Sequence, residues 1–298
     1  MPELPEVQAH AERLEISLAG AVLERVESLA FAALKTYQPP PDAAVGRPLE
    51  TVGRRGKLLV LGFGDQSHVV HLMQGGRLRP DSGAGQRPKS RLKGGLMRWH
   101  FRDHPALTLT EAGTERKAGI WVVEGDPLSQ PPLDGLGPEA DKVEPDRMAA
   151  LFTAHPQRLH GFLRDQRVIA GLGRRLANEV CHRARLSPFA LIGGLTEEAA
   201  MRVVDAIRLA VTEGLAFERA RGEMSASKDR PAAVHDRAGE ACPTCGDTVR
   251  AVVYRDYTVN YCPSCQTGGK ILADNVYSRL GLDRDAQPAR ASRRPRRR

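Results

Sequence analysis

Apolar residues recur at helical spacing at the very start of the chain. Val7, Ala11, Leu14 and Leu18 fall on one face of a helix with 3.6 residues per turn. Pro5 suits the first turn of such a helix, because the N–H group that proline lacks has no partner there. The pattern therefore predicts a first helix that packs one apolar face against the rest of the protein.

Short apolar or alternating runs follow as far as residue 123. Turn residues separate them, among them Gly56 in the sequence Arg-Arg-Gly-Lys that ends at Lys57. Many short strands joined by turns are typical of a β-sandwich or a barrel. The runs are Val22–Leu34, Leu49–Phe63, Val69–Leu72, Leu96–Phe101, Leu107–Thr110 and Ile120–Val123.

The pattern changes after residues 125–145, which are rich in Pro, Gly and Asp and predict a linker. Beyond it the apolar spacing is helical over Pro145–Ala154, His160–Ala170, Arg174–Ala184 and Glu197–Arg219. We therefore expect an α+β protein built from consecutive units. The expected units are an N-terminal β-sandwich with flanking helices (2–124), a helical domain (146–223), a cysteine-rich module (238–275) and a disordered basic tail (283–298).

Four of the five cysteines form two close pairs near the C-terminus. Cys242 and Cys245 are separated by sixteen residues from Cys262 and Cys265. Four thiolates in two such pairs satisfy a tetrahedral Zn²⁺ ion and leave no open position, so the site is expected to be structural. Side chains in the interval between the pairs alternate in character as in the strands of a β-hairpin, which predicts a zinc ribbon. The fifth cysteine, Cys181, lies in a helical run and is expected to be a core residue.

The formal net charge of +8 is unevenly distributed. Residues 51–100 hold ten basic and two acidic residues, and six arginines occupy the last nine positions. Such basic segments favour an anionic partner. No apolar run is long enough to span a membrane, and the first residues lack the apolar segment of a secretory signal. We therefore expect a cytoplasmic protein.

The N-terminus carries residues that suit covalent chemistry. A small second residue permits removal of the initiator methionine, which would leave Pro2 with a free secondary amine. Such an amine can attack an electrophilic carbon and form an iminium ion. Glu3 and Glu6 would lie beside it, and close carboxyl groups can be held at different pKa values. Acidic residues are also ordinary at a helix start, because they complement the helix dipole.

Three motifs together resemble those of the formamidopyrimidine-DNA glycosylase/endonuclease VIII family of base-excision repair enzymes. They are the Pro-Glu-Leu-Pro-Glu-Val sequence that begins at Pro2, the Arg-Arg-Gly-Lys turn at Lys57, and the four-cysteine ribbon that ends at Cys265. The resemblance extends over nearly the whole chain, from residue 2 to about residue 275. It implies that residues 146–223 form the family's helix–two-turn–helix module.

The resemblance also implies a role for each site residue. Pro2 would attack C1′ of a damaged nucleotide, Glu3 would protonate the sugar ring oxygen, and Glu6 would support the site. Lys57 would contact a phosphate and the lesion, and His71 would bind the DNA backbone. The implied activity is that of a DNA glycosylase and abasic-site lyase that acts by β,δ-elimination on a flipped nucleotide. The implied partner is double-stranded DNA, bound by a monomer that holds one structural zinc ion.

The chain departs from the family pattern at the residues that bind the DNA backbone and at those that enter the base stack. The family's intercalating Met aligns with Gln74, and a second wedge hairpin has no counterpart. Arg174 stands where the family has an Asn that binds phosphate. The arginine of the zinc hairpin is replaced by Tyr257, with Arg255 two residues earlier. We therefore expect Gln74, Arg174 and Arg255 to contribute to DNA binding in place of the residues that the family usually has.

These departures leave three functions open. The N-terminal motif favours excision of oxidised purines such as formamidopyrimidines or 8-oxoguanine. The absent wedge and the short segment at residues 224–237 leave oxidised pyrimidines as an alternative. A non-catalytic binder of damaged or abasic DNA is the third possibility, although such a binder would have no need of Pro2 and Glu3.

Overall fold

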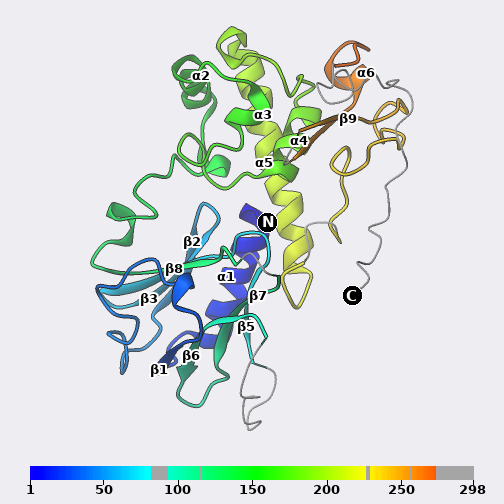
Figure 1. Cartoon of the computed structure of the whole chain (residues 1–298). Helices are drawn as coiled ribbons and strands as arrows, with labels where there is room; N and C mark the ends of the chain where they lie inside the picture. Colours follow the sequence, from blue (N-terminus) through cyan, green and yellow to red (C-terminus); the bar gives the residue numbers. More distant parts are fainter. Residues whose placement is uncertain (82–92, 114–115, 226–228, 255–256, 273–298) are drawn as a thin grey trace.

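The computed structural model describes residues 1–81, 93–113, 116–225, 229–254 and 257–272 (Figure 1). The first helix, α1 (Leu4–Leu18), begins at a capping box in which Glu3 and Glu6 each bond the other's backbone N–H. Its buried face holds Val7, Ala11 and Leu14, as the apolar spacing predicts. Helix α1 packs against the longest helix of the second half, α5 (Glu197–Arg219).

The first half of the chain folds into two four-stranded antiparallel sheets, which confirms the predicted sandwich. One sheet has the order β1-β6-β7-β5 and the other β2-β3-β4-β8. The first contains β1 (Leu23–Ser28), β5 (Gly76–Pro80), β6 (Gly95–Phe101) and β7 (Leu107–Glu111). The second contains β2 (Thr51–Arg55), β3 (Leu58–Phe63), β4 (Gln66–His71) and β8 (Gly119–Glu124).

A shared core joins the two sheets and α1. Large side chains from both sheets lie in it, including Phe63 of β3 and Trp99 of β6. The Trp99 indole N–H donates to His68 Nδ1 on β4 at 2.7 Å, so a hydrogen bond crosses the core between the sheets. Burial lowers the pKa of His68 to about 4, and the ring therefore stays neutral and able to accept this bond.

The second half is helical and has its own core. It contains α2 (Pro145–Ala154), α3 (Leu159–Phe162), α4 (Arg174–Arg183) and α5, which Figure 1 shows running from the helical region down to α1. Cys181 is completely buried in this core, as expected. None of the described helices combines the length and the apolar character that crossing a bilayer requires.

Two predicted elements are wrong in extent. The helix expected over His160–Ala170 ends at Phe162, because residues near Ala170 bond a distant segment instead. Ala170 N–H donates to the Pro138 carbonyl at 2.8 Å, and its own carbonyl accepts from Ala140 N–H at 3.0 Å. The strand expected over Val22–Leu34 ends at Ser28 and gives way to a short 3₁₀ turn, η1 (Phe31–Ala33).

The cysteine module lies against α4 at the end of the helical half. It consists of the hairpin β9 (Arg250–Val253) and β10 (Thr258–Tyr261), followed by the short helix α6 (Pro263–Gln266). Three further 3₁₀ turns lie in the connections, namely η2 (Pro127–Ser129), η3 (Ala140–Lys142) and η4 (Ile192–Gly194). The basic tail at 283–298 lies outside the described residues.

Candidate active site

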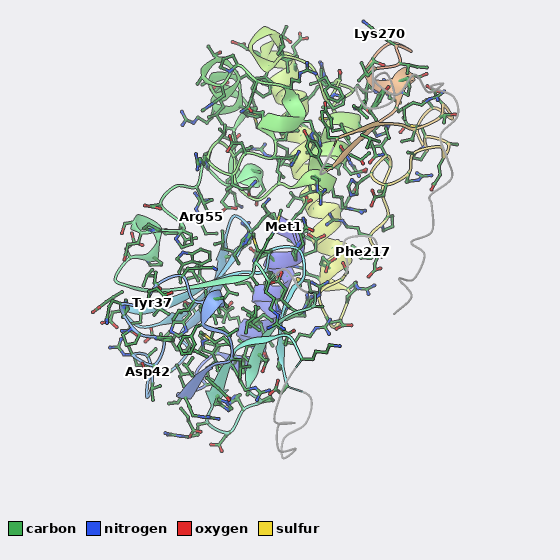
Figure 2. All side chains as sticks on the ribbon, in the orientation of Figure 1. Met1, Tyr37, Asp42, Arg55, Phe217 and Lys270 are labelled. Carbon is green, nitrogen blue, oxygen red and sulfur yellow. The ribbon has the colours of Figure 1, made fainter. Side chains whose placement is uncertain are left out.

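The N-terminus lies where the sheets and the helices meet. Figure 2 shows Met1 near the middle of the molecule, between Arg55 of the β2–β3 hairpin and Phe217 of α5. Pro2 is buried, whereas Met1 is partly exposed. Burial lowers the pKa of the Met1 amine, the Glu3 carboxylate opposes that shift, and Arg174 adds to it. The first residues of the chain therefore have both carboxyl and guanidinium groups around them.

The Glu3 carboxylate is bonded to the first turn of α4. Its Oε1 accepts from Arg175 N–H at 2.9 Å, and its Oε2 accepts from Leu176 N–H at 3.0 Å. Unpaired N–H groups and the helix dipole make such a turn a favourable place for a carboxylate. Gly173 permits this approach, because a Cβ atom there would lie 2.4 Å from Glu3 Oε1. One side chain thus caps α1 and anchors α4.

Glu6 is the more deeply buried carboxyl group, with 1% of its surface exposed. Its Oε2 accepts from Glu3 N–H at 2.9 Å, and its Oε1 lies 3.3 Å from Arg230 Nη1. Burial raises the pKa of Glu6, while the Arg230 charge opposes the shift. Arg230 is buried as well, so Glu6 is enclosed and holds the turn that presents Pro2 and Glu3.

Lys57 reaches the same place from the turn between β2 and β3. Gly56 adopts a positive φ of 56° there, a conformation that glycine tolerates without strain. The Lys57 Nζ donates to the Leu172 carbonyl at 2.9 Å, directly before α4. Burial lowers the pKa of Lys57 to about 8, with the Glu3 carboxylate acting in the opposite sense. We call Pro2, Glu3, Glu6 and Lys57 together the N-terminal corner.

The hairpin that carries Lys57 is tied to the second half of the chain by Glu139. This carboxylate accepts from Gly56 N–H at 2.7 Å and from Arg55 Nη1 at 2.6 Å, and it also pairs with Arg54. These bonds join residues that lie more than 80 positions apart in the sequence. They fix the position of the hairpin tip against the segment that precedes α2.

The predicted DNA-binding residues surround the corner at different depths. His71, at the end of β4, is half-buried, and burial together with the Lys57 charge lowers its pKa to about 4. Gln74 is exposed in the turn after β4, where Met73 has a φ of 50°. Arg174 is the first residue of α4 and lies close enough to affect the Met1 amine. Arg255 lies outside the described residues.

Sequence reasoning missed three arginines near the corner. Arg230 pairs with Glu6, Arg77 adds to the lowering of the Met1 amine pKa, and Arg164 adds to the lowering of the Lys57 pKa. Arg230 and Arg164 come from segments with no motif of their own, and Arg77 follows His71 by six residues without having been assigned a role. The only signal in the sequence is the excess of arginine over lysine, which does not single out these positions.

The four cysteines of the ribbon converge as a tetrahedral site requires. Their sulfur atoms all lie within 4.8 Å of one another, and the Sγ–Sγ distances include 3.4 Å and 3.9 Å. A zinc ion about 2.3 Å from each sulfur would separate the sulfurs by about 3.8 Å. His182 of α4 lies with its Nε2 3.3 Å from Cys242 Sγ. The set fits a structural zinc ion, with His182 as an outer hydrogen-bond partner.

Comparison with known proteins agrees with this geometry. Residues 1–119 match the model of the formamidopyrimidine-DNA glycosylase N-terminal domain. The chain is 31% identical over 290 residues to a formamidopyrimidine-DNA glycosylase of Geobacter sulfurreducens, covering 89% of this chain and all of that protein. It is 41% identical over 153 residues to an uncharacterized formamidopyrimidine-DNA glycosylase-like protein of Mycobacterium tuberculosis, covering 49% of this chain and 93% of that one.

Solved structures share the same architecture. The MutM (Fpg) protein of Thermus thermophilus superimposes with a TM-score of 0.75 at 28% identity, over 91% of this chain and all of that one. Lactococcus lactis Fpg bound to DNA with an abasic site gives a TM-score of 0.77 at 20% identity, over 89% of this chain and 99% of that one. The second likeness concerns the fold alone. From its sequence relatives, its fold and its N-terminal motif, the chain belongs to the formamidopyrimidine-DNA glycosylase/endonuclease VIII family of DNA repair glycosylases.

Proposed function

We propose that this protein is a bifunctional DNA glycosylase and abasic-site lyase that excises oxidised bases from double-stranded DNA. The observation that carries the proposal is the buried start of the chain, where Pro2 adjoins a Glu3 carboxylate held by two N–H groups of α4. Removal of Met1 would convert the Pro2 nitrogen into a secondary amine beside that carboxylate. A fixed nucleophile next to a fixed proton carrier is the arrangement that covalent catalysis requires.

The proposed reaction begins when the Pro2 lone pair bonds to C1′ and the bond from C1′ to the damaged base breaks. The base leaves with the bonding electrons and takes a proton from water, while the N–H proton of the amine passes to the Glu3 carboxylate. The nitrogen lone pair then forms a C=N bond as the C1′–O4′ bond breaks, and Glu3 protonates O4′. The resulting iminium ion acidifies the C2′ proton, and loss of that proton expels the 3′ phosphate. The conjugated iminium ion then acidifies the C4′ proton, and loss of this second proton expels the 5′ phosphate. Water finally releases Pro2.

The proposal assigns the surrounding residues to binding. Lys57 would contact a phosphate next to the lesion, and the neutral His71 ring would donate a hydrogen bond to the backbone. Gln74 would enter the space left by the flipped base. Arg174 would present a guanidinium group to a phosphate at the start of α4, and Arg255 would do so from the zinc hairpin. Glu6, enclosed away from solvent, would hold the N-terminal turn in place.

We propose oxidised purines as the preferred lesions. The N-terminal motif, which has Leu at position 4, supports this choice. So does the similarity over 89% of the chain to proteins named formamidopyrimidine-DNA glycosylase. A panel of duplexes carrying formamidopyrimidine, 8-oxoguanine or an oxidised pyrimidine tests this choice directly. Faster excision of the pyrimidine would replace the purine assignment with the alternative. We further propose that the enzyme works as a cytoplasmic monomer holding one structural zinc ion.

Trapping by borohydride tests the chemistry itself. Abasic-site DNA incubated with the protein and borohydride should give a covalent adduct, because reduction converts the iminium ion into a stable amine. Pro2→Gly should reduce adduct formation by at least about a hundredfold while leaving the affinity for the duplex largely intact. Absence of any adduct from the wild-type protein would leave a non-catalytic binder of damaged DNA as the better account.

A further inference from the structure

A stack of aromatic and guanidinium groups runs along the zinc hairpin beside the corner. The Tyr257 and Tyr254 rings are nearly parallel, with centroids 4.7 Å apart and an interplanar angle of 12°. The Arg164 guanidinium carbon lies 4.4 Å from the centroid of the Tyr257 ring. We call Arg164, Tyr254 and Tyr257 the ribbon edge. Stacking on an aromatic face fixes a guanidinium group while its N–H donors stay available in the plane.

The backbone of Arg164 is tied to the loop that Lys57 binds. The Gln166 amide donates to the Arg164 carbonyl at 2.8 Å and to the Leu172 carbonyl at 2.8 Å. The same Leu172 carbonyl accepts from Lys57 Nζ at 2.9 Å. Gln166 also accepts from Gly171 N–H at 3.0 Å. Lys57 and Arg164 are therefore held on one short, hydrogen-bonded framework.

Arg164 has no carboxylate partner among the described residues. Its charge is close enough to lower the pKa of both Lys57 and His160, although burial is the main cause of both shifts. A half-buried arginine that repels neighbouring cations is costly unless a ligand supplies the missing anion.

We propose that Arg164, held against the ring of Tyr257, binds a DNA backbone phosphate beside the one that Lys57 faces. This inference rests on the proposed function, because it takes duplex DNA as the ligand. It adds a phosphate contact next to the ribbon from a residue of the segment after α3, with Tyr257 as the positioning residue. The guanidinium of Arg164 would bind two phosphate oxygens side by side.

The test measures binding of the full-length protein to a duplex that carries a stable abasic-site analogue, over a series of salt concentrations. Arg164→Gln should weaken binding about tenfold and lower the slope of log affinity against log salt by about one. Tyr257→Leu should weaken binding by a similar factor, whereas Tyr257→Phe should retain wild-type affinity because it keeps the ring. The double variant Arg164→Gln/Tyr257→Leu should bind no more weakly than Arg164→Gln alone.

Arg147→Gln provides the matched control, since Arg147 is exposed on α2 and its loss removes the same charge. An Arg164→Gln protein that binds like the control, with the wild-type salt slope, would overturn the proposal. Fully additive losses in the double variant would overturn the role of Tyr257. If Tyr257→Leu loses its zinc, the comparison of Arg164→Gln with Arg147→Gln still decides the phosphate contact.

The borohydride assay separates this inference from the proposed function. If wild-type protein forms no adduct, the lyase assignment fails whatever Arg164 does. If wild-type protein forms the adduct but Arg164→Gln binds with unchanged affinity and salt slope, only the phosphate contact is wrong.

Discussion

The N-terminal corner and the ribbon edge hold their polar groups by different means. In the corner, backbone N–H groups fix the Glu3 carboxylate, and a backbone carbonyl fixes Lys57. At the ribbon edge, Arg164 is held by the face of an aromatic ring. Backbone bonds leave little freedom of position, whereas a stacked guanidinium can turn in its plane. The corner matches the family motif at every position, and the ribbon edge does not.

The difference between the two sites indicates that residues which bind phosphate tolerate substitution better than residues around a reacting atom. A reacting atom must lie within a fraction of an ångström of its target, so the groups around it are fixed by the main chain. A phosphate is a large anion that several cations can reach from different elements. Replacement of a hairpin arginine by Tyr257 is therefore compatible with the same chemistry, provided that another cation takes the phosphate.

Glu3→Gln is expected to have the largest effect on the corner. An amide offers one oxygen where the carboxylate offers two, and it cannot carry the proton for the sugar oxygen. Single-turnover excision should fall by at least about a hundredfold, while duplex affinity changes by about twofold or less. Glu15→Gln, on the exposed side of α1, is the matched control. Excision at the control rate would show that Glu3 is not the proton carrier.

Removal of zinc should act on the ribbon edge more than on the corner. Without the metal nothing holds the four sulfur atoms together, and the β9–β10 hairpin loses its anchor. Affinity for duplex DNA should fall by at least about tenfold after treatment with a chelator, the loss expected for one charge-assisted phosphate contact, and recover when zinc is added. Binding that is unchanged in metal-free protein would show that the ribbon does not contribute to the grip on DNA.

Gly173→Ala should damage the corner more mildly. The added methyl group would lie 2.4 Å from Glu3 Oε1, so the carboxylate has to move away from α4. Excision should slow by about tenfold with duplex affinity unchanged, because a small displacement of a catalytic group is costly. Gly193→Ala is the control, since a Cβ there meets nothing within 4 Å. Equal rates for the two variants would contradict the fixed position of Glu3.

The smallest expected effect is a pH dependence of binding. The pKa of Lys57 is about 8 in the folded protein, below its usual value, so its positive charge is lost as the pH rises from about 7 to about 9. Over that pH range, the affinity of the wild-type protein for duplex DNA should weaken about fivefold more than the affinity of Lys57→Met does. His71, with a pKa of about 4, stays neutral throughout and should add nothing. Parallel pH profiles would contradict a phosphate contact by Lys57.

The features predicted from sequence are those whose evidence is local. The spacing of Val7, Ala11 and Leu14 predicted α1, and the two cysteine pairs predicted the ribbon. The strand β5 was missed, because it is short and ends in Pro80, which a strand pattern excludes. The helix expected over His160–Ala170 fails because tertiary bonds near Ala170 override a local helical pattern.

The contacts that build the site could not be predicted in the same way. Glu3 bonds residues more than 170 positions later, and Glu6 pairs with Arg230 in a distant part of the chain. Neither periodicity nor composition specifies which distant segments meet. The family resemblance supplied the expected roles of Pro2 and Glu3. It contained no information about Arg164, which stacks on Tyr257, a residue that departs from the family pattern.

Helix α4 is bonded at both ends to parts of the molecule with separate tasks. Its first turn holds Glu3, and His182 near its last turn contacts Cys242. Ten residues span about 15 Å, so a tilt of about 4° at one end displaces the other by about 1 Å. Helix α4 is thus a rigid connection between the cysteine cluster and the Glu3 carboxylate. A displacement of the ribbon that tilts α4 would therefore also move the Glu3 carboxylate.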